Sequence, residues 1–317
     1  MGKRRGISGL SRFLPQADAK EDNVRPAKKR KLSDSAVGVP VPTSSWVEKY
    51  DATGLVPHYQ HASEVPEHLQ KYFAQRTRFL SLYSTSPGCL LDEEGWYSIT
   101  PELIADRIAE RCRCATILDA FCGVGGNTIA FAKTCERVIA LDISPTRLAL
   151  ARHNAQIYGV ADRIEFILTD YVSFAESYLS MCSNKNPSRK IDVVFLSPPW
   201  GGPGYISGSS SQSSSPAEPE AEADATHPSY TLASIQPLHG AELFQLSRRI
   251  TRNVAYYLPR NTRLDEIGAL LADPTTDVNG SVREMVEVEE EWMGPKLKAL
   301  TCYTGGLAEG QPELFDA

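Results

Sequence analysis

Short apolar runs alternate with longer segments of helical periodicity from residue 116 onward. The runs, which we interpret as strands, are Thr116–Asp119, Arg137–Asp142, Ile164–Leu168, Asp192–Leu196 and Val254–Leu258. The helical segments are Asn127–Cys135, Pro145–Tyr158, Ala241–Ile250 and Leu264–Leu271. This β-α-β-α order predicts an α/β fold, in which helices cover both faces of a mostly parallel sheet.

The flanking segments complete this pattern. Glu67–Arg111 has helical apolar spacing and predicts a small helical cap, while Val282–Trp292 and Lys296–Thr304 predict a closing hairpin. Ser144 is a suitable N-cap for the helix that begins at Pro145. We therefore expect a disordered arm at 1–57, the cap at 58–111 and the α/β domain at 112–317. A disordered serine-rich and acidic insertion is expected at about 207–229.

Composition narrows the class of protein. Of the 317 residues 42% are hydrophobic, enough for one substantial core or at most two domains. No window approaches the run of about 18 apolar residues that a membrane span needs, and no apolar stretch follows the basic N-terminus as in a secretory signal. We therefore expect an intracellular protein without membrane contact. The seven cysteines lack paired C-x-x-C spacing, which favours reduced thiols over a metal site.

Charge is distributed unevenly. Residues 1–31 hold ten Lys and Arg against three acids, a net charge of +7, which leaves −13 for the remainder of a chain whose total is −6. An acidic body does not attract nucleic acid unspecifically, so any RNA contact is expected to be local. The cluster Ala27–Lys31 is typical of a nuclear localisation signal, with a merely solvated charge run as the alternative.

A glycine-rich turn follows the first strand, and three acids end the first three strands. The turn contains Gly123 and Gly125, and the acids are Asp119, Asp142 and Asp170. Glycines let the backbone approach a ligand, and the carboxyl ends of parallel strands are where open α/β sheets bind ligands. Helix N-caps are the alternative role for the acids. A nicotinamide cofactor is the rival ligand, but an Asp that precedes the glycines favours a sulfonium cofactor.

The fourth strand leads into Ser197-Pro198-Pro199-Trp200. Two prolines fix the backbone and free the preceding carbonyl groups from sheet pairing. Acceptors at Ser197 and the Pro198 carbonyl suit the exocyclic amine of a flat base, while Trp200 stacks on its face. A guanine methylated at N7 is cationic and stacks more strongly on Trp than a neutral base does. A proline-rich turn with Trp200 as ordinary core is the alternative.

Together these features resemble the trimethylguanosine synthase family of RNA cap guanine-N2 methyltransferases. The resemblance covers about Lys71–Leu307 and rests on five motifs: Lys71–Arg76, Glu94–Pro101, Asp119–Asn127, Ser197–Pro203 and Leu258–Asn261. It implies a Rossmann-like class I S-adenosylmethionine-dependent methyltransferase fold with a mostly parallel seven-stranded sheet. The sequence departs from the family at Asn184–Lys190 and in the serine-rich and acidic stretch after Tyr205.

The resemblance also implies roles for individual residues. The S-adenosylmethionine pocket would be lined by Thr100, Asp119, Gly123, Gly125, Asp142, Asn154, Asp170 and Ser197. The catalytic turn would be Ser197, Pro198 and Trp200, with Ser197 and Trp200 holding the methylated guanine, and the cap would also be bound by Lys71, Arg260 and Asn261. Lys71 and Arg260 would grip the cap phosphates, with a solvated charge as the alternative for each.

The expected reaction is methyl transfer to N2 of the 7-methylguanosine cap of small nuclear and nucleolar RNAs, which gives 2,2,7-trimethylguanosine. Guanine N2 would attack the sulfonium methyl in line, without a metal or a covalent enzyme intermediate. The expected protein is a nuclear or nucleolar monomer whose basic arm contacts ribonucleoprotein core proteins. The alternatives are an adenine-N6 or ribosomal guanine-N2 methyltransferase, and a noncatalytic cap- or RNA-binding scaffold.

Overall fold

The computed structural model describes residues 47–181, 190–201, 229–271 and 284–308 of the chain. The expected serine-rich and acidic insertion lies almost wholly outside these residues, as do the basic cluster Ala27–Lys31 and Asn184–Lys190 apart from Lys190. In the described part of the chain, no helix is long and apolar enough to cross a membrane.

A seven-stranded sheet organises the described residues. The strands are β1 (Thr116–Asp119), β2 (Arg137–Asp142), β3 (Ile164–Leu168), β4 (Val193–Leu196), β5 (Val254–Pro259), β6 (Glu287–Met293) and β7 (Lys296–Tyr303). Their order is β3-β2-β1-β4-β5-β7-β6. The first five strands are parallel, and β7 pairs antiparallel with both β5 and β6. The predicted mostly parallel seven-stranded sheet of the class I fold is confirmed, and the hairpin closes it as predicted.

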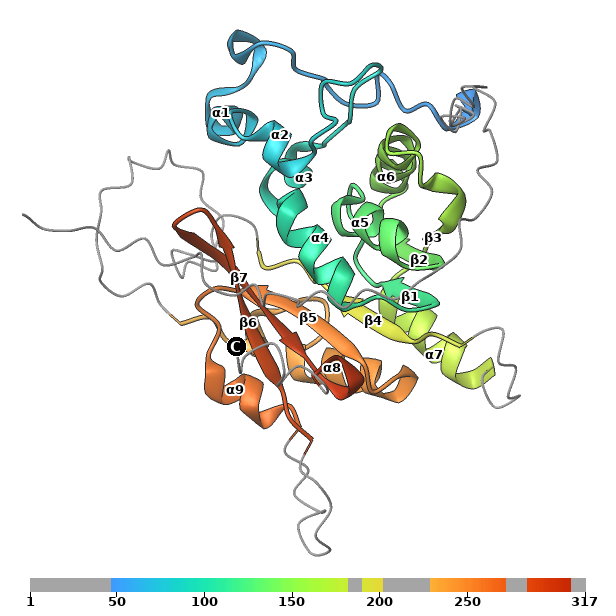
Figure 1. Cartoon of the computed structure of the whole chain (residues 1–317), viewed down its shortest axis with the longest axis vertical. Helices are drawn as coiled ribbons and strands as arrows, with labels where there is room; N and C mark the ends of the chain where they lie inside the picture. The colour runs from blue at the N-terminus through green and yellow to red at the C-terminus, as the bar shows by residue number, and fades with distance from the viewer. Residues whose placement is uncertain (1–46, 182–189, 202–228, 272–283, 309–317) are drawn as a thin grey trace, which may run out of the picture. The chain divides into compact units, whose positions relative to one another are not determined.

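Helices cover both faces of this sheet (Figure 1). They are α4 (Glu102–Arg111), α5 (Gly126–Thr134) and α6 (Pro145–Ile157) on one face, and α7 (Tyr171–Met181), α8 (Gly240–Ile250) and α9 (Leu264–Ala269) on the other. Strand side chains alternate between the two layers: Phe195 and Tyr257 belong to the α4–α5 core, whereas Leu196 and Leu258 belong to the α7–α8 core. This alternation follows from the two-residue period of a strand.

Helix boundaries agree with the sequence pattern with one omission. The Ser144 side chain accepts a hydrogen bond from the Arg147 backbone N–H, and Pro145 lies in the first turn, so the predicted cap of α6 is confirmed. Helix α7 was not predicted. Its signal is the Asp170 side chain, which accepts a 2.9 Å hydrogen bond from the Ser173 backbone N–H and thereby caps the helix.

The segment before β1 forms the expected helices and has a core of its own. Helices α1 (Glu67–Phe73), α2 (Arg76–Phe79) and α3 (Glu93–Ser98) contribute to a buried cluster that also includes Val124 and Leu150. Helix α4, by contrast, packs with α5 in the core of the sheet. The cap is therefore built mainly by the three shorter helices, while α4 belongs to the layer that covers the sheet.

Residues 47–57 are a correction to the expected arm. The Ala52 backbone N–H donates to Nδ1 of the buried His153 over 3.1 Å, and the Gln156 side chain bonds to Val47 and Tyr50. The Arg152 guanidinium lies 4.4 Å from the centre of the Tyr50 ring. These contacts fix the segment on α6, so ordered structure begins earlier than its charged composition indicated.

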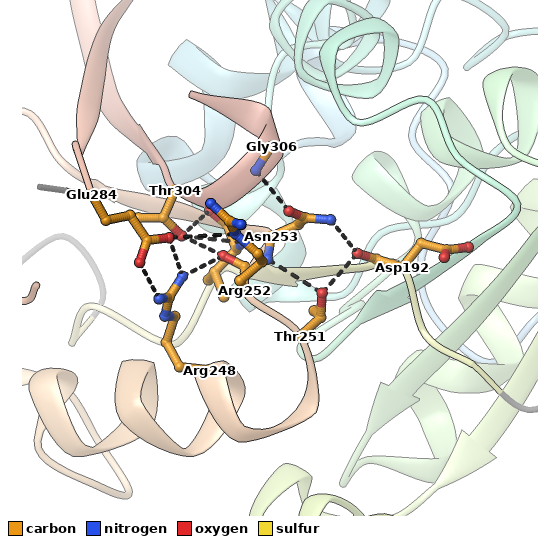
Figure 2. Close-up of polar contacts among 9 residues, drawn as sticks. Asp192, Arg248, Thr251, Arg252, Asn253, Glu284, Thr304 and Gly306 are labelled. Atoms are coloured by element: carbon orange, nitrogen blue, oxygen red, sulfur yellow. Dashed lines mark hydrogen bonds and ion pairs between the residues drawn. The ribbon is translucent and has the colours of Figure 1, made fainter. Parts of the chain in front are cut away.

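The amino end of the parallel strands is closed by a polar cluster (Figure 2). The Asp192 carbonyl accepts hydrogen bonds from the Thr251 hydroxyl and the Asn253 amide, both at 3.0 Å. The Asn253 side-chain oxygen in turn accepts from the Gly306 backbone N–H at 2.8 Å. The cluster therefore ties together the segments that precede β4 and β5 and the segment that follows β7.

Candidate active site

The carboxyl ends of β1, β2, β3 and β4 bring most of the predicted site residues to one edge of the sheet. The parallel register pairs Asp119 with Phe195 and pairs Asp142 with Leu168. Strand order reverses here, because β2 and β4 lie on opposite sides of β1. Such a reversal leaves a crevice at the carboxyl ends of the two central strands, the usual ligand site of an open α/β sheet.

The glycine turn between β1 and α5 depends on the absence of side chains. Gly125 has a φ of 94°, and a Cβ atom there would lie 3.2 Å from the Cα and Cβ atoms of Ala151. The Gly123 backbone N–H donates to the Asp142 carboxylate over 3.0 Å. The turn is thereby held against α6 and against the end of β2.

Asp119 is a buried carboxyl group at the base of this turn. It accepts hydrogen bonds from the Thr128 hydroxyl at 2.6 Å and from the Phe121 backbone N–H at 3.4 Å. Burial raises the pKa of Asp119 to about 7, although these two hydrogen bonds favour the charged form. Such a group gains charge stabilisation from a bound cation, which suits the amino-acid end of a sulfonium cofactor.

The other two predicted acids have different surroundings. Asp142 accepts from the Gly123 and Ser144 backbone N–H groups, and burial raises its pKa. Asp170 is exposed, and its hydrogen bonds with Ser173 lower its pKa. The helix N-cap alternative therefore holds for Asp170, whereas α6 is capped by Ser144 rather than by Asp142.

Thr100 and Asn127 form a second polar pair beside the glycine turn. The Asn127 amide donates to the buried Thr100 hydroxyl over 2.9 Å. The Asn127 side-chain oxygen is buried without a hydrogen-bond partner among the described residues. A buried acceptor of this kind costs about 1–3 kcal/mol unless a ligand donates to it. It fits an ammonium group, and sequence reasoning had not singled out Asn127.

Asn154 has a different place from the one expected. It is fully buried, and its amide donates to the carbonyls of Leu90 and Val124, both at 2.9 Å, while its oxygen accepts from the Leu90 backbone N–H at 2.7 Å. Both N–H groups of the Asn154 amide therefore bond to backbone carbonyls. Asn154 joins the cap to the glycine turn, and its contribution to a cofactor pocket is to position that turn.

Two exposed apolar side chains complete this edge. Ile143 follows Asp142 and is 71% exposed, and Leu168 pairs with Asp142 across the sheet and is 57% exposed. Large apolar groups beside carboxylates suit a flat ring that carries hydroxyl and amine groups, such as an adenosyl group. Together with Asp119 and Asn127, they make the described residues compatible with S-adenosylmethionine.

The turn after β4 carries Ser197 and Pro198, whose carbonyl groups are the predicted acceptors. Neither the Ser197 nor the Pro198 carbonyl oxygen accepts a hydrogen bond from any residue that the structure describes. Ser197 and Trp200 are partly exposed, whereas Pro198 is buried. The two carbonyl groups are therefore available to an amine at the same edge as Asp119.

Trp200 lies against Tyr257 of β5. The two rings stack with centroids 5.3 Å apart and an interplanar angle of 29°. Tyr257 also contacts Phe195, which contacts Phe131 in the core. Trp200 is thus supported from one side by a column of buried aromatic rings. Tyr257 was not identified from the sequence, because only the packing of β5 beside β4 brings it to Trp200.

The predicted phosphate-binding residues lie on separate elements. Arg260 follows β5, and its guanidinium donates to the Leu297 carbonyl over 3.4 Å. The Asn261 carbonyl accepts from the Tyr230 backbone N–H at 2.8 Å. Lys71 is exposed on α1, with its ammonium 5.2 Å from the centre of the Tyr72 ring. Arg260 and Asn261 share the edge of the turn after β4, whereas no contact between described residues links Lys71 to it.

The chain was compared with known protein families and solved structures. The RNA cap guanine-N2 methyltransferase family model matches residues 114–213 and 225–307. The residues between these two matched segments fall within the expected serine-rich and acidic insertion. Among solved structures, that of a putative methyltransferase from Porphyromonas gingivalis aligns with this chain at 12% sequence identity and a TM-score of 0.48. The alignment covers 78% of this chain and 55% of that one.

Two curated relatives carry the same name. Trimethylguanosine synthase of Schizosaccharomyces pombe is 34% identical over 250 residues, which cover 75% of this chain and 87% of that protein. Trimethylguanosine synthase of Saccharomyces cerevisiae is 32% identical over 206 residues, which cover 63% of this chain and 57% of that protein. Since the family model spans more than half of the chain, and a relative above 30% identity aligns with three quarters of it, this protein belongs to the RNA cap guanine-N2 methyltransferase family.

Proposed function

We propose that this enzyme transfers methyl groups from S-adenosylmethionine to N2 of the 7-methylguanosine cap of small nuclear and nucleolar RNAs, giving 2,2,7-trimethylguanosine. The observation that carries the proposal is the turn after β4. It combines the carbonyl oxygens of Ser197 and Pro198, which accept no hydrogen bond from the residues that the structure describes, with the indole of Trp200. Acceptors beside an aromatic face match an exocyclic amine on a purine ring.

Trp200 would recognise the charge of the cap. Because one face of the indole is packed on Tyr257, the base would stack on the opposite face. N7 methylation gives the guanine a delocalised positive charge, which adds about 0.5–2 kcal/mol to stacking on Trp. The turn would therefore discriminate a methylated cap from an unmethylated one.

The cofactor would be held by the edge residues of β1 and β2. Asp119, with its raised pKa, and the Asn127 oxygen, which has no partner in the described part of the chain, would bind the amino-acid end. Asp142 would accept from ribose hydroxyls, and Ile143 and Leu168 would flank the adenine. S-adenosylmethionine supplies an electrophilic methyl group when it is bound.

Catalysis would be mainly positioning. The Ser197 and Pro198 carbonyls would hold the N–H groups of guanine N2 and orient its lone pair out of ring conjugation, toward the methyl carbon. The turn from Ser197 to Gly201 contains no His, Asp or Glu. The proton of the methylated amine would be released to water after transfer, so a strong general base is not required.

The test offers labelled S-adenosylmethionine with 7-methylguanosine-capped RNA and, in parallel, the same RNA with an unmethylated guanosine cap. We expect label at N2 of the methylated cap and at least several-fold less on the other RNA. Equal labelling would contradict recognition of the cap charge. Label on adenine N6 or on an internal guanine would support the alternative base specificities, and S-adenosylmethionine binding without any transfer would support a scaffold.

The basic arm suggests where the enzyme acts. The cluster Ala27–Lys31 and the net charge of +7 over residues 1–31 support a nuclear or nucleolar location and contact with ribonucleoprotein core proteins, and we propose a monomer. Replacing Lys28, Lys29, Arg30 and Lys31 with Ala in a fluorescent fusion should move the protein to the cytoplasm while methylation in vitro is retained. Unchanged nuclear fluorescence would contradict the assignment.

A further inference from the structure

The β6–β7 hairpin extends beyond the end of β5 on the site edge of the sheet (Figure 1). The register pairs Pro259, the last residue of β5, with Ala299 of β7, so Lys296–Lys298 continue past the end of β5, where Arg260 follows. In the hairpin, Trp292 pairs with Leu297 and Met293 pairs with Lys296. The turn of the hairpin is therefore a neighbour of the proposed phosphate site.

Arg260 and Trp292 are both neighbours of Leu297 in this hairpin. The Arg260 guanidinium donates to the Leu297 carbonyl, and Leu297 is the strand partner of Trp292. In a capped RNA the triphosphate connects the methylated guanosine to the first transcribed nucleotide. If Arg260 grips this triphosphate, as the family resemblance implies, the next nucleotide leaves the site beside the hairpin.

Trp292 has the character of a stacking platform. It is 44% exposed, the most exposed tryptophan of the described residues, and its indole N–H donates to the Glu290 carboxylate over 2.9 Å. This hydrogen bond limits the rotation of the ring, so less entropy is lost when a base stacks on it. Base stacking on an aromatic side chain is tolerant of sequence because every base has a π face.

The hairpin is also held by helix α4. Arg111 of α4 forms ion pairs with Glu287 and Glu289, and Arg107 donates to the Trp292 carbonyl over 3.3 Å. These pairs leave less of the negative charge of β6 to repel RNA.

We propose that the hairpin turn, Trp292–Lys298, is a second RNA-binding site that stacks the nucleotide following the cap on the indole of Trp292. It rests on the proposed function, and it adds a substrate contact outside the cap pocket. It also gives the acidic body of the enzyme a local way to hold RNA beyond the cap.

The test compares two substrates, 7-methylguanosine triphosphate and a short RNA with a 7-methylguanosine cap. In Trp292→Ala we expect kcat/KM and affinity for the capped RNA to fall about tenfold, the size of one lost base stack. The values for 7-methylguanosine triphosphate should stay within twofold, because this ligand has no second nucleotide. Trp292→Phe, which keeps an aromatic ring, should restore most of the loss.

Met181→Ala is the matched control, since Met181 is also an exposed large side chain, at 56%, but lies at the end of α7, which starts at the carboxyl edge of the sheet after β3 and runs toward the amino edge. Met181→Ala should leave kcat/KM and affinity unchanged for both substrates. Equal values for the wild type and Trp292→Ala with capped RNA would overturn the proposal, and so would an equal loss with both substrates. Absence of wild-type turnover on either substrate would instead contradict the proposed function, and the binding measurement with capped RNA would still test Trp292.

Discussion

The two ends of the parallel strands differ in how their polar groups are satisfied. At the amino end, Asp192, Thr251 and Asn253 bond to one another or to neighbouring backbone (Figure 2). At the carboxyl end, the Asn127 oxygen and the Ser197 and Pro198 carbonyls have no partner among the described residues. The first end closes the fold, and the second retains polar groups for ligands. Stability and function are therefore expected to separate between the two ends.

The largest expected effect is a loss of activity from a mutation at the carboxyl end. Trp200→Ala removes the stacking surface of the base and should lower kcat/KM for 7-methylguanosine-capped substrate by about 100-fold or more. The S-adenosylmethionine dissociation constant should stay within about twofold, because Trp200 is assigned to the base. Steady-state kinetics and calorimetry give the two values. Unchanged turnover would refute the stacking role of Trp200.

A mutation at the amino end should show the opposite pattern. Asn253→Ala removes the donor to the Asp192 carbonyl and the acceptor for the Gly306 N–H, and should lower the free energy of unfolding by about 2 kcal/mol. Urea denaturation measures this loss. At a temperature where the variant is folded, kcat/KM should be unchanged. Asn253→Asp keeps the acceptor alone and should lose about half as much stability; a larger effect on turnover than on stability would contradict the assignment.

The sequence predicted the sheet because its local signals agree. Each predicted strand is a short apolar run, and Ser144 and Pro145 mark the start of α6. The predicted site residues Asp119, Asp142 and Ser197 lie at one edge of the sheet, as expected, since the carboxyl ends of parallel strands share one edge. Helix α7 was overlooked, although its cap, Asp170, had been noted in another role.

Other parts of the site depend on contacts between distant segments. Asn154 reaches Leu90, 64 residues away in sequence, and Tyr257 reaches Trp200 only because β5 lies beside β4. No periodicity or motif encodes such a pairing. The order of residues 47–57 likewise comes from their contacts with α6 rather than from their own composition. Sequence reasoning therefore predicted which residues gather at this edge but not the residues that support them.

The smallest expected effect concerns Asp119, which is buried like a core residue but lies at the ligand edge. Because burial raises its pKa to about 7, the group is increasingly protonated below that pH. A cationic cofactor binds the carboxylate form, so affinity for S-adenosylmethionine should fall by up to about tenfold per pH unit below 7 and level off above it. Calorimetry between pH 5.5 and pH 7.5 measures this slope.

Asp119→Asn should have the weaker affinity and a shallower slope, with any remaining dependence due to Asp142, whose pKa burial also raises. An unchanged slope in Asp119→Asn would contradict the assignment.

In the cofactor-free protein, the stability of the fold depends on pH with the opposite sign. A folded-state pKa above the unfolded value gives Asp119 a stabilising contribution at low pH that is lost as pH rises through about 7. Stability of the free protein and affinity for the cofactor should therefore change in opposite directions over the same pH range, as expected of a carboxylate whose charge is compensated by its ligand rather than by the fold.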